Sequence, residues 1–402
     1  MKRLLFAHCL LAIALAACQR PDESSIVALA DSTLGLPPLT APHTVLPLPA
    51  QIELGRKLFM DRRLSYNDTM SCAMCHVPEQ GFTSNELATP IGFEGQSLRR
   101  NAPTILNVAY VRRLFHDGRE SSLEKQAWGP LLAANEMANP SVDHVVSKIK
   151  ALPDYQHLFE SAFNGREVGR ETIGTALASY ERTLLSGNSR FDRWRYGQVK
   201  TAINDNEQAG FRIFSGKANC IACHSMDKNS ALFTDGKFHN TGIGWLSSAE
   251  NARMTYRVQL APGLNVTMDA RTLQSVSEAA SNDAGRYEVT RNVVDRGSYR
   301  TPTLRNIALT SPYMHDGSLS ALEQVVEFYD RGGIDNPDKD VLLQPLHLSS
   351  DEKRDLLAFL RTLTGENVKE LGIQARAAAV GGGPTQSFRE RAGDDPSGNR
   401  KP

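Results

Sequence analysis

The pattern Cys-x-x-Cys-His occurs at two places in this chain of 402 residues. Two thiols at this spacing can add across the vinyl groups of a haem, and the adjoining histidine then becomes the proximal ligand of the iron. A zinc half-site or a redox-active dithiol could use one such copy, but two copies that both end in histidine favour c-type haem. The chain is therefore expected to fold around two covalently bound haems, one attached at Cys72, Cys75 and His76 and the other at Cys220, Cys223 and His224.

The amino terminus has the order of a secretory signal. Two basic residues precede an apolar stretch from Leu4 to Leu15, which is too short to span a bilayer, and small residues follow it. Leu15-Ala16-Ala17-Cys18 also resembles a bacterial lipobox, in which the cysteine becomes the acylated first residue. An ordinary cleavage near Ala17 is the alternative, but it would leave an exposed thiol open to oxidation. We expect a signal peptide over residues 1–17, a lipid anchor at Cys18, a tether over residues 18–49, and a periplasmic location.

The charge of the chain argues against nucleic-acid binding, and its cysteine content argues against disulfides. The chain has 45 basic and 45 acidic residues, so it lacks the basic excess that is typical of a nucleic-acid-binding protein. Of its six cysteines, Cys9 leaves with the leader and Cys18 is assigned to lipid. The other four belong to the two haem motifs, so no pair remains for a disulfide.

Similar segments precede the two haem motifs. Ile52 to Phe59 and Glu207 to Phe214 both place apolar residues at spacings of two to four, one loop before the motif. Two similar segments about 150 residues apart are too widely spaced for a solenoid repeat and indicate a duplicated domain. We expect a mainly α fold with two cytochrome c-like domains, each carrying one covalent haem, over residues 50–195 and 196–366.

Apolar spacing predicts further helices, and strand signals are sparse. A polar, turn-rich stretch over residues 246–300 could hold a short hairpin, and the Gly-rich and charged residues 367–402 are expected to form a disordered tail. The expected helices are Leu123–Trp128, Val142–Ala151, Ile173–Leu185, Leu322–Tyr329 and Asp351–Leu363.

Several other segments accompany the haem motifs. They are Asn101 to Asn107, Asp117-Gly118-Arg119, Gln126 with Pro130 and Asn135-Glu136-Met137, Thr303 to Asn306, and Pro312 to Gly317. In this combination the chain, from about Leu54 to Thr364, resembles the bacterial diheme cytochrome c peroxidase family and, within it, the MauG-like branch. The resemblance implies a peroxidatic N-terminal haem and a C-terminal partner haem that supplies or stores an electron equivalent.

The resemblance also implies different sixth ligands for the two irons. Family members that need reductive activation carry a distal histidine in a Gly-His pair where this chain has Gly92-Phe93. Phenylalanine cannot ligate iron, so the first haem is expected to be five-coordinate and open to peroxide. Tyr329, followed by Asp-Arg-Gly-Gly, matches the tyrosine ligand of the MauG-like branch for the second haem. A core tyrosine is the alternative reading, and Met314 and His315 are rival donors.

Three residues of this chain correspond to family residues that lie over the distal face of the first haem. Glu136 corresponds to the general acid–base that moves a proton between the peroxide oxygens, Gln126 to a hydrogen-bond donor, and Pro130 to a residue that keeps water from the iron. A solvated loop carboxylate is the alternative for Glu136. The family usually places tryptophan before Asp-Gly-Arg, between the haems, and this chain has His116 there. His116 is thus a candidate bridge, with Phe115, Trp128 or a propionate path as alternatives.

A calcium ion between the domains is usual in the family. The matching positions are the side chain of Asn101 and the backbone carbonyls of Thr310 and Pro312. A turn cap is the alternative role for Asn101.

Three functions remain after these observations. The first is a haem enzyme that reacts with hydrogen peroxide to reach a high-valent diheme state and oxidises a periplasmic partner protein, with aromatic side-chain modification as one form of that reaction. The second is a peroxide-detoxifying cytochrome c peroxidase fed by a small cytochrome or cupredoxin. The third is an electron-transfer cytochrome without catalysis, which would leave Glu136 and an open haem face without a use.

Overall fold

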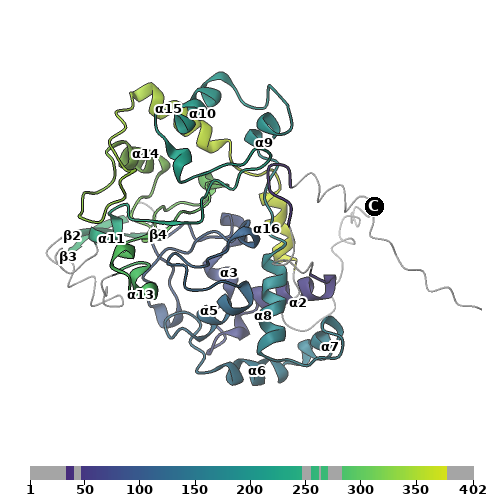
Figure 1. Cartoon of the computed structure of the whole chain (residues 1–402). Coiled ribbons are helices and arrows are strands. Elements are labelled where there is room, and N and C mark those ends of the chain that lie inside the picture. The colour runs from purple at the N-terminus through teal and green to yellow at the C-terminus, as the bar shows by residue number, and fades with distance from the viewer. Residues whose placement is uncertain (1–32, 40–46, 247–254, 262–263, 270–282, 378–402) are drawn as a thin grey trace, which may run out of the picture.

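The computed structural model describes residues 33–39, 47–246, 255–261, 264–269 and 283–377, and these are mainly helical (Figure 1). Long loops connect the helices, which gather around two separate apolar cores. One core is formed by the first half of the chain together with a C-terminal helix, and the other by the second half. Each core adjoins one of the two haem motifs.

The first core is built on the crossing of α2 (Pro49–Met60) and α8 (Arg170–Glu181). Gly55 makes this crossing close, because a Cβ there would lie 1.8 Å from the carbonyl oxygen of Ala176. The buried face of α2 includes Leu58 and Phe59, which are almost completely shielded. The other helices of this half are α3 (Cys72–Cys75), α4 (Leu123–Gln126), α5 (Trp128–Leu132), α6 (Val142–Lys150) and α7 (Leu158–Ala162).

The second core repeats this crossing with α10 (Asp205–Ser215) and α15 (Ser350–Arg361). Here a Cβ on Gly210 would lie 1.9 Å from the carbonyl oxygen of Asp355. Helix α14 (Leu322–Asp330) packs against α15 and carries Tyr329. The remaining elements are α9 (Arg190–Arg195), α11 (Ile243–Leu246), α13 (Tyr287–Thr290) and the antiparallel pairs β1 (Phe238–His239) with β4 (Tyr299–Arg300) and β2 (Thr255–Ala261) with β3 (Leu264–Asp269).

A second feature shared by the two halves shows which residues of one half correspond to which residues of the other. Asn107 and Asn306 both adopt left-handed backbone angles of φ 61° and ψ 18°. The Asn107 N–H donates to the Leu184 carbonyl at 2.7 Å, and the Asn306 N–H donates to the Leu363 carbonyl at 3.0 Å. The segments after α8 and α15 are therefore equivalent, with Leu184 corresponding to Leu363.

Most expected elements are present with shifted ends. Residues 123–128 are divided between α4 and α5, and the helix expected at 173–185 begins earlier, as α8 at Arg170. Helices α6, α14 and α15 lie where the apolar spacing placed them. The hairpin expected within residues 246–300 is confirmed as β2 and β3.

The prediction of a disordered tail over residues 367–402 is wrong for its first part, which is helical. Helix α16 (Val368–Arg376) packs on the first half of the chain, with Val368 and Ala375 buried. Arg376 forms an ion pair with Glu79 at 2.7 Å, which secures the end of this helix. The missed signal was the apolar spacing from Val368 to Ala375, and residues 378–402 lie outside the described part.

The tether expected over residues 18–49 also differs in part. Within the segment 33–39 the carbonyl of Gly35 accepts hydrogen bonds from Arg305 Nη2 at 2.6 Å and from the Ala231 N–H at 2.9 Å. Leu36 is buried, so this segment packs on the protein. The expected signal peptide and Cys18 lie outside the described residues, and no described helix is long and apolar enough to cross a membrane.

Candidate functional site: two haem cavities

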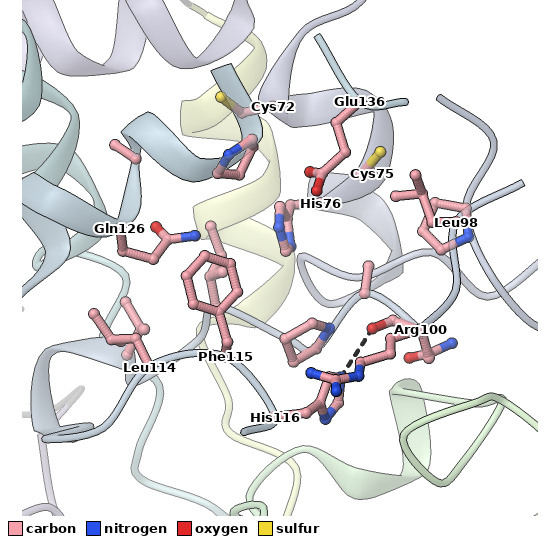
Figure 2. A pocket seen from close by; sticks show the side chains of 18 of the residues that line it. Cys72, Cys75, His76, Leu98, Arg100, Leu114, Phe115, His116, Gln126 and Glu136 are labelled. Atoms are coloured by element: carbon pink, nitrogen blue, oxygen red, sulfur yellow. Dashed lines mark hydrogen bonds between the residues drawn. The ribbon is translucent and has the colours of Figure 1, made fainter. Parts of the chain in front are cut away.

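The first haem motif lines a cavity of about 710 Å³ (Figure 2). Helix α3 is a single turn that carries Cys72 and Cys75, and the His76 N–H donates to the Cys72 carbonyl at 2.9 Å. His76 Nδ1 lies 3.2 Å from the carbonyl oxygen of Phe82. Because a carbonyl only accepts, Nδ1 carries the proton and Nε2 keeps its lone pair for a metal. Burial lowers the pKa of His76, which favours this neutral form.

The second haem motif is arranged in the same way around a smaller cavity of about 290 Å³. The His224 N–H donates to the Cys220 carbonyl at 2.9 Å, and His224 Nδ1 lies 2.9 Å from the carbonyl oxygen of Phe233. Among the described residues, none of the four motif cysteines forms a disulfide, so all four sulfurs remain for attachment to haem. Cys223 also lies beside Asp235 and His239 in a cluster that could hold a metal ion, but attachment to haem would use the same sulfur.

Tyr329 and both of its rivals line the second cavity. Tyr329 comes from the last turn of α14. His315 is held by its surroundings, because its ring stacks on Tyr299 with 3.6 Å between ring centroids and its carbonyl accepts from the Asn101 N–H at 2.7 Å. Met314 has a positive φ of 73° in the preceding turn. The three donors expected from the sequence are thus brought to one cavity.

Gln126, Pro130 and Glu136 all line the first cavity. Gln126 ends α4 and Pro130 lies in α5, while Glu136 lies on the turn that follows, where its N–H donates to the Ala133 carbonyl at 3.0 Å. Figure 2 shows the amide of Gln126 and the carboxylate of Glu136 directed into the same space as the His76 ring. A hydrogen-bond donor and a proton acceptor therefore face one small region of the cavity.

Phe93 is not among the residues that line the first cavity. Its N–H donates to the Asn135 carbonyl at 3.1 Å, and its ring meets Tyr66 edge-on at 6.2 Å. Gly92 makes this contact close, because a Cβ there would lie 1.9 Å from the Asn135 carbonyl. The loop with Phe93 thus supports the turn that carries Glu136.

His116 lies in the wall that separates the two cavities, and it lines both. Its Nε2 lies 2.9 Å from the carbonyl oxygen of Asn101, so this nitrogen donates. Burial lowers the pKa of His116 to about 4, which leaves the imidazole neutral near pH 7. Of the alternative bridges, Phe115 lines only the first cavity, and Trp128 is buried in the first core.

Arg300 lines both cavities as well, and the sequence analysis did not identify it. Its guanidinium donates to the carbonyls of Phe115 at 3.3 Å and Thr301 at 3.5 Å. No described carboxylate pairs with it, and burial lowers its pKa to about 10, so it remains a cation near pH 7. A partly buried cation without a counter-ion favours an anionic partner. Haem carries carboxylates, so the donor set and this charge together fit a haem in each cavity.

The three residues expected to bind calcium line the second cavity. Asn101 lies in the shared wall, and its Nδ2 donates to the Ala88 carbonyl at 2.8 Å. Thr310 and Pro312 lie on the loop before Met314. The structure brings these positions to one cavity.

Two haem-attachment motifs, each with a histidine nitrogen available to iron in its own cavity, define a diheme c-type cytochrome. Residues 49–200 match the family model described as di-haem cytochrome c peroxidase. The chain is 38% identical to the methylamine utilization protein MauG of Methylorubrum extorquens, over 82% of this chain and 83% of that protein. It is 37% identical to the cytochrome-c peroxidase IdrP1 of Pseudomonas sp., over 82% of this chain and 84% of that one. The chain belongs to the di-haem cytochrome c peroxidase family.

A solved structure agrees with this assignment. The crystal structure of a MauG-like protein associated with microbial copper homeostasis is 31% identical and matches with a TM-score of 0.67, over 83% of this chain and 95% of that one. Membership of this family implies two haem c groups.

Proposed function

We propose that the protein is a periplasmic enzyme of the MauG type, which reacts with hydrogen peroxide at the first haem and uses the oxidising equivalents on a partner protein. The observation that carries the proposal is the contrast between the cavities: Glu136 and Gln126 face the space in front of His76, whereas Tyr329 lines the space near His224. A haem bound in the first cavity would supply the oxidation chemistry.

The residues of the first cavity would manage the proton of peroxide. Glu136 would take the proton from one peroxide oxygen and return it to the other, which becomes the leaving group. Gln126 would orient the peroxide through its amide N–H. Pro130 offers no hydrogen bond from its side chain and would keep competing water out of this part of the cavity.

Tyr329 would be the sixth ligand of the second iron. A phenolate is a hard anionic donor that favours ferric iron, whereas a methionine ligand raises the potential. His116, in the wall between the cavities, would carry charge between the haems in the place where relatives have tryptophan. This role rests on its position in both cavity walls.

Further proposals concern the organisation of the chain. We assign residues 50–195 and 196–366 to two cytochrome c-like domains, each with one apolar core, and add α16 to the first of these cores. A calcium ion would be held at the wall by Asn101, Thr310 and Pro312. The signal peptide and the lipid anchor at Cys18 remain proposals from the sequence.

A detoxifying cytochrome c peroxidase is the second candidate. It is favoured by the nearly equal identity to a named cytochrome-c peroxidase and to MauG. In this case a small cytochrome or cupredoxin would donate electrons to the second haem, and no partner would be modified.

Stoichiometric hydrogen peroxide added to the purified holoprotein separates these candidates. The MauG-type proposal expects a spectral change in the oxidised protein without prior reduction, followed by mass changes in a partner. A requirement for prior reduction, or turnover with a small electron donor and no modified partner, would favour the second candidate. Two haems inert to peroxide would contradict both.

A further inference from the structure

Besides Glu136, three carboxyl groups line the first cavity, and two of them, Asp117 and Glu288, are paired with arginines. The third is Glu181. Glu181, at the end of α8, is only 8% exposed and lines the cavity one turn after Leu177. Within the described part of the chain, its side chain has no hydrogen bond or ion pair, because the neighbouring Arg182 pairs with Glu124 of α4 instead. A carboxyl group in this position is costly to bury and therefore calls for an explanation.

The second half has leucine at the corresponding place. Leu184 and Leu363 are equivalent because their carbonyls accept the same hydrogen bond, from Asn107 and Asn306 respectively. The residues three positions before these leucines are Glu181 in the first half and Leu360 in the second, so these two residues also correspond. Leu360 lines the second cavity, so one position in the fold presents a carboxyl to one haem and an alkyl group to the other.

The surroundings of Glu181 favour its neutral form. Burial raises its pKa to about 8, the nearby charge of Arg182 opposes this, and Glu124 adds to it. Glu181 is also close enough to Cys72 for its carboxylate to raise the pKa of that thiol. The charged or titratable groups around it include Tyr180 of α8, Arg182 directly after α8, Glu124 of α4 and Cys72 of α3, and Glu136 lines the same cavity.

We propose that Glu181 couples proton exchange to electron transfer at the first haem, and that Leu360 removes this coupling from the second. Where Glu181 is ionised in the oxidised protein, it takes up one proton from solvent when the haem attached at Cys72 gains one electron from an external one-electron donor, and it releases the proton when that electron leaves. The physical reason is that an added negative charge nearby favours the neutral acid over the carboxylate. The inference deepens the proposed function and rests on its placement of a haem in the first cavity.

The test is a spectroelectrochemical titration of the holoprotein at several pH values between about 6 and 9. Below about pH 8 Glu181 already holds its proton in the oxidised protein, so the midpoint potential of the first haem should change little there. At higher pH the potential is expected to fall as the pH rises, by at most a tenfold change in the redox equilibrium per pH unit, or about 59 mV for one electron. Glu181→Gln and Glu181→Leu should both lose this slope. Glu171→Gln, which changes an exposed carboxylate at the start of the same helix, should retain it.

The second half provides the converse experiment. Leu360→Glu should add a pH-dependent fall to the potential of the second haem, and Leu360→Gln, of matched size and polarity, should not. Haem attachment is measured separately by the haemochrome spectrum of each variant. An unchanged slope in Glu181→Gln with both haems attached would overturn this inference alone, whereas a wild-type chain without haem at Cys72 and Cys75 would overturn the proposed function as well.

Discussion

In the first half, the cavity with the haem motif measures about 710 Å³, and the carboxyl groups in its wall include Glu136 and Glu181. In the second half the cavity measures about 290 Å³ and presents Tyr329 and Leu360 at its wall. The motif, the histidine tautomer and the helix crossing are shared, so the duplicated scaffold does not explain the difference. The difference lies in a few side chains that line each space, and these are what variants can exchange.

The largest expected effect is on the first cavity alone. Glu136→Gln keeps the size of the side chain and removes its ability to accept a proton, so the rate of reaction with peroxide should fall by about 10²–10⁴-fold. Stopped-flow absorbance measures this rate. Glu79→Gln, which changes a surface carboxylate paired with Arg376, serves as the control and should react like wild type. A wild-type rate in Glu136→Gln would remove the acid–base role.

A substitution at Tyr329 should affect the second haem alone. Tyr329→Met replaces a hard anionic donor by a thioether, so the potential of the second haem should rise, within the range of roughly 0.8 V that axial ligands span. Redox titration followed by absorbance measures both haems at once. Met314→Leu is the matched control at the rival donor. A shift in the potential of the second haem with Met314→Leu, and none with Tyr329→Met, would show that Met314 is the ligand.

Arg300 should act on both halves, because it lines both cavities. Arg300→Gln removes a buried cation, so oxidised iron becomes easier to form and both midpoint potentials should fall. Arg300→Lys keeps the charge and should move them much less. The same redox titration reports the result, and a shift in only one haem would show that Arg300 serves one cavity.

The smallest expected effect is one that the two halves should share. Gly55→Ala and Gly210→Ala each force a methyl group against a carbonyl of the crossing helix, and overpacking of this kind costs about 1–3 kcal/mol in the free energy of unfolding. Thermal unfolding of the holoprotein should show a lower Tm for both. Gly372→Ala in α16, where the nearest atom would be 3.3 Å away, should unfold close to wild type. The same Tm in all three variants would mean that the crossing helices can move apart without a loss of stability.

The haem motifs are read directly from the sequence, and most helices were predicted because apolar spacing is a local pattern. The prediction failed at α16, where the Gly-rich and charged residues that follow concealed an apolar face, and at Leu36, whose burial depends on contacts with distant residues. Arg300 and Glu181 were missed for a related reason. Among the described residues neither has an ion-pair partner, and no spacing along the chain records that.

The claim that the two halves are chemically unequal is tested most directly by a low-temperature EPR spectrum of the resting ferric holoprotein. Two different signals are expected: a high-spin signal from the open haem at Cys72, Cys75 and His76, and a low-spin signal from the haem at His224 with Tyr329 as its second axial ligand. Two low-spin signals would contradict the open first cavity. Two high-spin signals would contradict ligation by Tyr329.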